Sequence, residues 1–271
     1  MMPFVRPRPQ ASPSLRVIAF HHAGGSAAMY HPMSAGLPAA WELLILDLPG
    51  RGKSFTEQPI SSMSGLIARA IEDVRPWLDV PIALFGHSMG AILAAEVGRA
   101  CERLGAPPIW VGVSGRVAPS LQTQTRRLTT LDDESLLAEL LALGGTSDRI
   151  GEFPEFRERF LRIVRADLSA VESYHPATGR ELLGCPVTAF SGTSDTYAPP
   201  TMMRPWARET RGEFHQCLFA GGHFYFLGSA FPSFTRDIVR EIEPCLDARI
   251  PLSACSSELR LANRGGHLSQ G

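Results

Sequence analysis

Long apolar runs and an excess of charge are both missing from this sequence. Its 271 residues carry 26 Lys and Arg against 27 Asp and Glu, which gives a formal net charge of −1 at pH 7. A chain without a basic excess has no field with which to hold nucleic acid or an anionic membrane surface. No apolar run approaches the roughly 20 residues that a helix needs to cross a bilayer. The sequence therefore argues against both of these protein classes.

Paired cysteines and a leader segment are also missing. The number of cysteines is odd, and no two of them have C-x-x-C spacing: Cys101, Cys185, Cys217, Cys245 and Cys255. The first residues, Met1 to Pro9, lack the apolar core of a secretory signal. We therefore expect reduced thiols and a cytoplasmic location.

The most informative stretch that is present is Gly86-His87-Ser88-Met89-Gly90. The apolar run before it predicts a buried strand, and the run after it predicts a helix. Strand, G-x-S-x-G and helix together are typical of a nucleophile elbow, in which a strained turn lifts a serine hydroxyl above the sheet edge. We expect both glycines to be required, because a Cβ at either position would collide with the neighbouring strand or helix. Ser88 is therefore the candidate nucleophile.

A nucleophilic serine needs a general base, and the base needs an acid that keeps it in the tautomer able to accept the serine proton. In α/β-hydrolases the acid and the histidine follow the serine in that order, each in a loop after a strand. Asp195 follows a predicted strand at 186–191, and His223 follows one at 214–219 after a pair of glycines. The sequence thus predicts a catalytic triad of Ser88, Asp195 and His223.

Other polar residues near these motifs are given different roles. His87 lies in the elbow, but its side chain should point away from the nucleophile as a packing residue. His175 precedes Asp195, which is the wrong chain order for the base. Asp167 has apolar neighbours at helical spacing, so we expect it to form a structural ion pair or an interhelical cap.

An oxyanion hole should be formed by two backbone N–H groups. One belongs to Met89, the residue after the nucleophile. For the other we choose Ala23, because the two glycines after it allow the turn that aims its N–H inward. His21 and His22 stand just before it, but adjacent strand residues point to opposite sides and no further ligand is near. We therefore expect no metal site there.

Short apolar strands alternate with amphipathic helices around these motifs, which predicts an α/β-hydrolase fold with a mostly parallel, doubly wound sheet. We expect this domain over residues 15–246, an extended arm over 1–14 and a disordered tail over 247–271. The predicted strands lie near 15–21, 41–47, 81–86, 109–114, 186–191 and 214–219.

The chain between the strands at 109–114 and 186–191 is longer than one crossover helix needs. It predicts one helix over 131–143, with Asp132 and Asp133 as N-terminal caps, and a second from about 154 to 174. The position of this segment over the elbow favours a helical lid at about 120–178 that covers an apolar acyl substrate. The alternative is that its helices only pack into the hydrophobic core. The second helix carries an apolar stripe of Phe156, Phe160, Ile163, Val164, Leu168 and Val171.

Several motifs resemble those of type II thioesterases, the stand-alone editing enzymes that accompany polyketide synthases and nonribosomal peptide synthetases. The resemblance spans about 17–243, with His21 and Ser147 standing where that family often has proline. It implies catalytic Ser88, Asp195 and His223, with Ala23 and Met89 as oxyanion donors. The motifs are F-H-H-A-G-G-S at 20–26, L-D-L-P-G-R-G at 46–52, G-H-S-M-G at 86–90, S-G-R at 114–116, L-G-G-T at 143–146, R-A-D-L at 165–168 and G-G-H-F at 221–224.

The resemblance further implies hydrolysis of acyl groups held as thioesters on the phosphopantetheine arm of an acyl or peptidyl carrier protein. No metal or redox cofactor is required for that reaction. A general serine esterase and a chain-releasing thioesterase are alternatives on the same fold. A non-catalytic ligand-binding module is an alternative of another class, which an intact triad disfavours.

Carrier proteins of this type are generally acidic, so a docking surface should carry arginines. Arg204, Arg208 and Arg211 are spaced i, i+4 and i+7, which predicts one face of a helix near the acid loop. For a row of arginines of this kind, a solvent-exposed face that binds no partner is favoured over a docking surface for a carrier protein.

Overall fold

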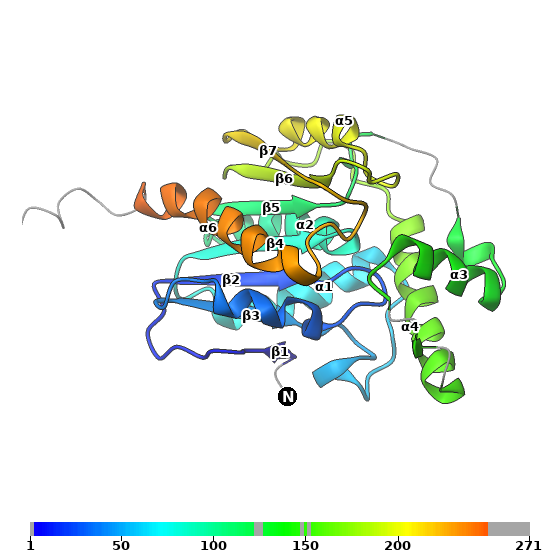
Figure 1. The fold of residues 1–271 in the computed structure, drawn as a ribbon. Coiled ribbons are helices and arrows are strands. Elements are labelled where there is room, and N and C mark those ends of the chain that lie inside the picture. Colours follow the sequence, from blue (N-terminus) through cyan, green and yellow to red (C-terminus); the bar gives the residue numbers. More distant parts are fainter. Residues whose placement is uncertain (1–2, 122–126, 147–148, 151–152, 249–271) are drawn as a thin grey trace, which may run out of the picture.

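The computed structural model describes residues 3–121, 127–146, 149–150 and 153–248. The strands in these ranges are β1 (Phe4–Val5), β2 (Leu15–Phe20), β3 (Trp41–Leu46), β4 (Ile82–His87), β5 (Trp110–Ser114), β6 (Val187–Gly192) and β7 (Phe214–Phe219). They form one sheet in the order β1-β3-β2-β4-β5-β6-β7, and all neighbours except β1 and β3 run parallel (Figure 1). The predicted fold class is confirmed, and the six predicted strands end within one residue of the observed bounds.

The strand order reverses between β2 and β4. The chain passes from β2 to β3 on one side and then crosses back to β4 on the other, so that Phe20 is paired with Gly86. In open α/β sheets the crevice beyond the carboxyl ends of the strands at such a switch point is where ligands bind. The loops that carry Ala23 and Ser88 leave the sheet at this place.

Helices cover both faces of the sheet, and each face has its own hydrophobic core. Adjacent strand residues divide between the two cores, as Val17 and Ile18 of β2 do, because successive side chains point to opposite faces. Burial on both faces explains why the strands are almost continuously apolar. One face carries α1 (Met63–Val74) and α2 (Met89–Arg103), and the other carries α6 (Phe231–Asp247) and the 3-10 helix η1 (Ala27–Ala35) (Figure 1).

The insertion between β5 and β6 contains two longer helices, α3 (Asp133–Leu143) and α4 (Pro154–Glu172), which stand together at one end of the sheet (Figure 1). The predicted cap of α3 is confirmed, because the Asp132 carboxylate accepts the N–H of Ser135 at 2.9 Å. The apolar stripe of α4 is shorter than predicted, since Phe156 is 71% exposed. A third, small core joins the two helices and consists of Leu128, Leu136, Leu140, Leu161, Val164 and Leu168.

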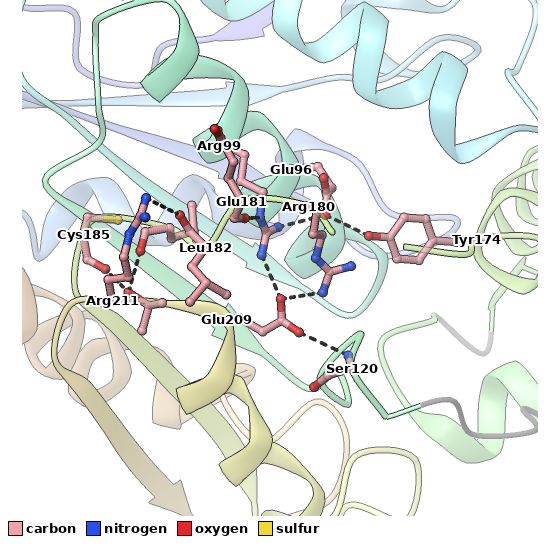
Figure 2. Close-up of polar contacts among 12 residues, drawn as sticks. Glu96, Arg99, Ser120, Tyr174, Arg180, Glu181, Leu182, Cys185, Glu209 and Arg211 are labelled. Atoms are coloured by element: carbon pink, nitrogen blue, oxygen red, sulfur yellow. Dashed lines mark hydrogen bonds and ion pairs between the residues drawn. The ribbon is translucent and has the colours of Figure 1, made fainter. Parts of the chain in front are cut away.

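A buried polar cluster ties both ends of this insertion to α2 (Figure 2). Arg99 of α2 donates to Glu96 and to Glu209, each at 2.8 Å. At the start of the insertion the N–H of Ser120 donates to Glu209 at 3.2 Å, and just beyond α4 the Tyr174 hydroxyl donates to Glu96 at 2.8 Å. The side chains of Arg99 and Glu209 are 1% and 3% exposed, so the cluster anchors the insertion to α2 inside the protein.

The N-terminal arm begins with a strand that its sequence does not signal. Phe4 of β1 pairs with Leu46 of β3, and its ring packs edge-on against that of Trp77 with centroids 5.8 Å apart. The Phe4 side chain is buried in the core on the α1 side of the sheet. Residues 3–5 therefore belong to the edge of the sheet.

The three arginines at 204, 208 and 211 do not share one helix face, so that prediction is wrong. The α-helix α5 (Pro200–Met203) ends before them, and Arg204 and Arg208 lie on the 3-10 helix η6 (Arg204–Glu209). A 3-10 helix has about three residues per turn, which places side chains four apart on different faces. Arg211 lies beyond the end of η6.

Other short 3-10 helices in the described ranges include η2 (Gly52–Ser54), η3 (Arg75–Trp77), η4 (Leu128–Thr130) and η7 (Gly228–Ala230). Of the helices in the described ranges, none combines the length and the apolar character that a bilayer crossing demands. Ser147, Cys255 and the predicted tail from residue 249 onward lie outside the described residues.

Candidate active site

The turn between β4 and α2 has the geometry of an elbow. Among the described residues Ser88 is the one non-glycine with a positive φ, at 55°. Such a conformation costs of order 1–3 kcal/mol and persists only where its surroundings enforce it. A Cβ on Gly86 would lie 1.9 Å from the carbonyl oxygen of Gly90, and one on Gly90 would lie 2.0 Å from that of Phe20. The expectation that both glycines are sterically required is confirmed.

His223 and Asp195 meet at the ends of neighbouring strands. The Nδ1 of His223 lies 2.8 Å from Oδ2 of Asp195, and both side chains are buried. An ionised carboxylate only accepts, so Nδ1 carries the proton and Nε2 is left as an acceptor. The other carboxylate oxygen accepts the N–H groups of Tyr197 and Ala198 at 2.8 and 3.0 Å.

The environment of Asp195 keeps its carboxylate charged. Burial by itself raises the pKa of Asp195, but the hydrogen bond and charge of His223 and the two backbone N–H donors outweigh it. The net result is a pKa below the ordinary value. The negative charge is therefore available to stabilise a protonated imidazole.

Ser88 and His223 line the same cavity, together with Ala23. Tyr197 and Phe224 lie beside them, while the rest of the wall is mostly apolar and much of it comes from the insertion. Leu140 is part of that wall, whereas the side chain of Phe160 packs over Gly24. Besides Ala23 and Phe224, the apolar lining residues are Val117, Leu128, Leu140, Leu143, Leu168 and Val171.

The two predicted oxyanion donors belong to residues at the cavity: Ala23 lines it, and Met89 directly follows Ser88, which also lines it. Met89 is the first residue of α2, so its N–H is one of the donors that a helix N-terminus leaves without an intrahelical partner. After Ala23 the chain reverses at Gly24, which has a φ of 77°. Within the described part of the chain, neither the Ala23 nor the Met89 N–H donates to a protein acceptor.

His87 lies behind the site, as its place in the elbow predicts. Its ring packs on that of His223 with centroids 4.7 Å apart, and its Nδ1 lies 2.8 Å from Oγ of Ser114. Burial, followed by the nearby His223, lowers the pKa of His87 well below its ordinary value. Burial likewise lowers the pKa of His22 to about 3, with smaller effects of His223 and Arg51. These rings are therefore neutral at pH 7.

In the described part of the chain, neither of two other polar residues singled out in the sequence is hydrogen-bonded to Ser88, Asp195 or His223. His175 is exposed, and its Nδ1 lies 2.9 Å from the backbone oxygen of Ser173. Asp167 forms a buried ion pair with Arg51, as the structural interpretation of this residue predicts. In the described ranges, no group of three or more His, Cys, Asp or Glu side chains is arranged to hold a metal ion.

Sequence reasoning gave no individual role to Arg116, which lines the cavity two residues after β5. Burial lowers the pKa of Arg116, and among the described residues it has no ion-pair partner. The S-G-R motif at 114–116 was the available signal, but it carries no indication of where the side chain lies.

Comparison with known proteins extends this picture. A family model described as a thioesterase domain matches residues 15–242. The gramicidin S biosynthesis protein GrsT of Aneurinibacillus migulanus is 30% identical over 229 residues, which cover 84% of this chain and 89% of that protein.

Two solved structures of type II thioesterases share the architecture. BorB, from the borrelidin biosynthetic cluster, is 35% identical with a TM-score of 0.79, over 90% of this chain and 97% of that one. YbtT, from the yersiniabactin NRPS/PKS biosynthetic pathway, is 29% identical with a TM-score of 0.80, over 90% of this chain and 99% of that one. With a family model that spans most of its length and relatives matched almost end to end, this chain belongs to the thioesterase family and has the α/β-hydrolase fold.

Proposed function

We propose that this protein is a serine thioesterase that removes acyl groups from the phosphopantetheine arm of carrier proteins, as an editing enzyme of polyketide or nonribosomal peptide biosynthesis. The observation that carries the proposal is the buried Asp195–His223 pair, whose histidine lines the same apolar cavity as the strained Ser88. The family membership and the biosynthetic pathways to which its relatives belong support it.

The proposed reaction begins with proton transfer from Ser88 to Nε2 of His223, because Nδ1 is committed to Asp195. The serine oxygen adds to the thioester carbonyl, and the N–H groups of Ala23 and Met89 stabilise the resulting oxyanion. Collapse of this intermediate breaks the carbon–sulfur bond, and His223 returns the proton to the leaving thiolate. Water, activated by the same histidine, then adds to the acyl-serine and releases the carboxylic acid.

The lining of the cavity supports an aliphatic acyl group as the substrate. Leucine and valine side chains from the insertion form much of its wall, so an aliphatic chain would be sheltered from water there. This arrangement supports a lid role for residues of about 120–178 beyond plain core packing. Because the acyl group would arrive on a carrier protein, we further propose that the enzyme works in the cytoplasm beside its synthase.

The direct test loads a carrier protein with acetyl, butyryl, hexanoyl and octanoyl groups and follows their loss by mass spectrometry. We expect the free phosphopantetheine thiol to appear with the wild-type protein and not with Ser88→Ala. Equal hydrolysis of simple oxoesters and thioesters would indicate a general esterase. Binding of acyl groups without turnover would indicate a ligand-binding module.

A further inference from the structure

An aspartate on the insertion reaches the loop that is proposed to stabilise the oxyanion. Oδ2 of Asp167, on α4, accepts the N–H of Gly24 at 2.8 Å. Gly24 directly follows Ala23, so this bond fixes the peptide plane that joins the two residues. We propose that Asp167 is a positioning residue that sets the direction of the Ala23 N–H through Gly24. The inference rests on the proposed function, because it assumes that Ala23 is an oxyanion donor.

The packing of α4 supports this role. A Cβ on Gly24 would lie 2.5 Å from Cγ2 of Val164 and 3.2 Å from Cε2 of Phe160, so the helix rests directly on the glycine. Residues 160, 164 and 167 are spaced i, i+4 and i+7, which places them on one face of α4. The face of α4 that packs against the loop therefore also carries the carboxylate that accepts the Gly24 N–H.

Arg51 holds the carboxylate in place. It donates through Nη2 to Oδ1 of Asp167 at 2.8 Å and through Nη1 to the other oxygen. The same guanidinium donates to the backbone oxygens of Gly25 at 3.4 Å and Pro49 at 3.2 Å. The Asp167 side chain is fully buried and that of Arg51 is 5% exposed. The ion pair thus joins the loop after β2, the loop after β3 and the helix α4 at one point.

This arrangement matters for the reaction because an oxyanion donor acts only within a narrow range of distance and direction. The bond restrains the backbone on the C-terminal side of Ala23, and without it the loop would be free to shift at Ala23 and move its N–H away from the developing charge without changing the triad. The helix α4 is therefore part of the catalytic site as well as a wall of the cavity.

The test separates binding of a transition-state mimic from binding of a substrate mimic in an Asp167→Asn variant. An alkyl trifluoromethyl ketone adds to the serine and places an oxyanion in the hole, whereas the matching acyl-chain thioether fills the cavity without forming one. We expect kcat on an acyl-N-acetylcysteamine thioester to fall by about 10-fold or more. The ketone affinity should fall by a similar factor, and the thioether affinity should stay at the wild-type value.

Two further variants keep the test decisive. Asp133→Asn removes another ion pair of α4, the exposed one with Arg165, and should behave as wild type. The double variant Arg51→Met with Asp167→Leu replaces the buried pair by apolar side chains, which proteins often tolerate without loss of folding. It should lose kcat and ketone affinity at least as much as Asp167→Asn does, because asparagine keeps one acceptor oxygen for Gly24 and Arg51 to share, whereas leucine offers the Gly24 N–H none.

Folded variants with wild-type kcat and ketone affinity would overturn the inference, and so would a parallel loss of ketone and thioether affinity. Failure of the proposed function looks different. In that case the wild-type protein itself would neither hydrolyse the thioester nor bind the ketone.

Discussion

The rings of His87 and His223 pack against each other with centroids 4.7 Å apart, although one belongs to the nucleophile turn and the other to the last strand's loop. Phe224 completes the contact, with its ring 5.1 Å from His87 and 5.2 Å from His223. The His223 imidazole is thus held by Asp195 at one nitrogen and by neighbouring rings on its surface. Its Nε2 is directed by packing as well as by the carboxylate.

Replacing Ser88 by alanine should abolish turnover and leave the fold intact. The loss should reach about 10⁶-fold if the three catalytic residues act as a unit. Steady-state hydrolysis of an acyl thioester measures the loss, and circular dichroism checks the fold. A serine-directed phosphonate should label Ser88 in the wild-type protein and nothing in the variant. Substantial hydrolysis by the purified variant would contradict the mechanism.

Replacing Asp195 by asparagine should cost about 10⁴-fold in kcat, because an amide favours the wrong tautomer of His223. The same change at Asp167 should cost much less, since that carboxylate positions the oxyanion loop and does not touch the histidine. Parallel kinetics on one thioester compare the two variants. If Asp167→Asn were the more damaging change, Asp195 would not be the catalytic acid.

Replacing Leu140 by asparagine should impair long acyl chains more than short ones, because this residue lines the cavity. We expect kcat/KM for an octanoyl thioester to fall about 10-fold relative to acetyl. Leu137 is also buried on α3 but is not part of the cavity wall, so Leu137→Asn is the matched control. An equal loss for every chain length would show that the segment is core and does not select substrates.

The buried histidines should make the protein less stable as the pH falls. Burial lowers the pKa of His21, His22 and His87 from 6.5. The unfolded chain therefore takes up protons below about pH 6.5 while the folded protein does not. The free energy of unfolding is therefore highest, with respect to these histidines, above that pH. It should decline below it by about 1.4 kcal/mol per pH unit for each histidine.

Urea unfolding at pH 7, 6 and 5 measures this slope. His87→Asn retains a group that can bond to Ser114 but removes one titrating site, so its unfolding free energy should fall less steeply with pH. A variant slope equal to that of the wild type would show that His87 is protonated in the folded state.

Local sequence patterns were sufficient wherever the structure depends on local rules. Glycines around Ser88 and the apolar strands before Asp195 and His223 place these three residues at the ends of β4, β6 and β7, because parallel strands deliver their loops to one edge. The order of the motifs along the chain then allowed the nucleophile, the acid and the histidine to be assigned.

Other features depend on contacts that no local pattern records. Phe4 lies on a two-residue strand, which is too short to show any periodicity. The spacing of Arg204 and Arg208 suits an α-helix, but the backbone there is a 3-10 helix. Arg51 and Asp167 are 116 residues apart in the sequence, so their pairing required the fold itself.

The buried cluster around Arg99 also defines where this enzyme could be recombined with a relative. Ser120 and Tyr174 both bond to carboxylates that the same arginine holds, so the two ends of the segment between them are anchored at one place beside α2. A chimaera with crossovers at these two residues would exchange α3 and α4, which form much of the cavity wall, and leave the elbow helix in place. The transplanted segment would have to bring an aspartate to the position of Asp167, since Arg51 and Gly24 remain with the recipient.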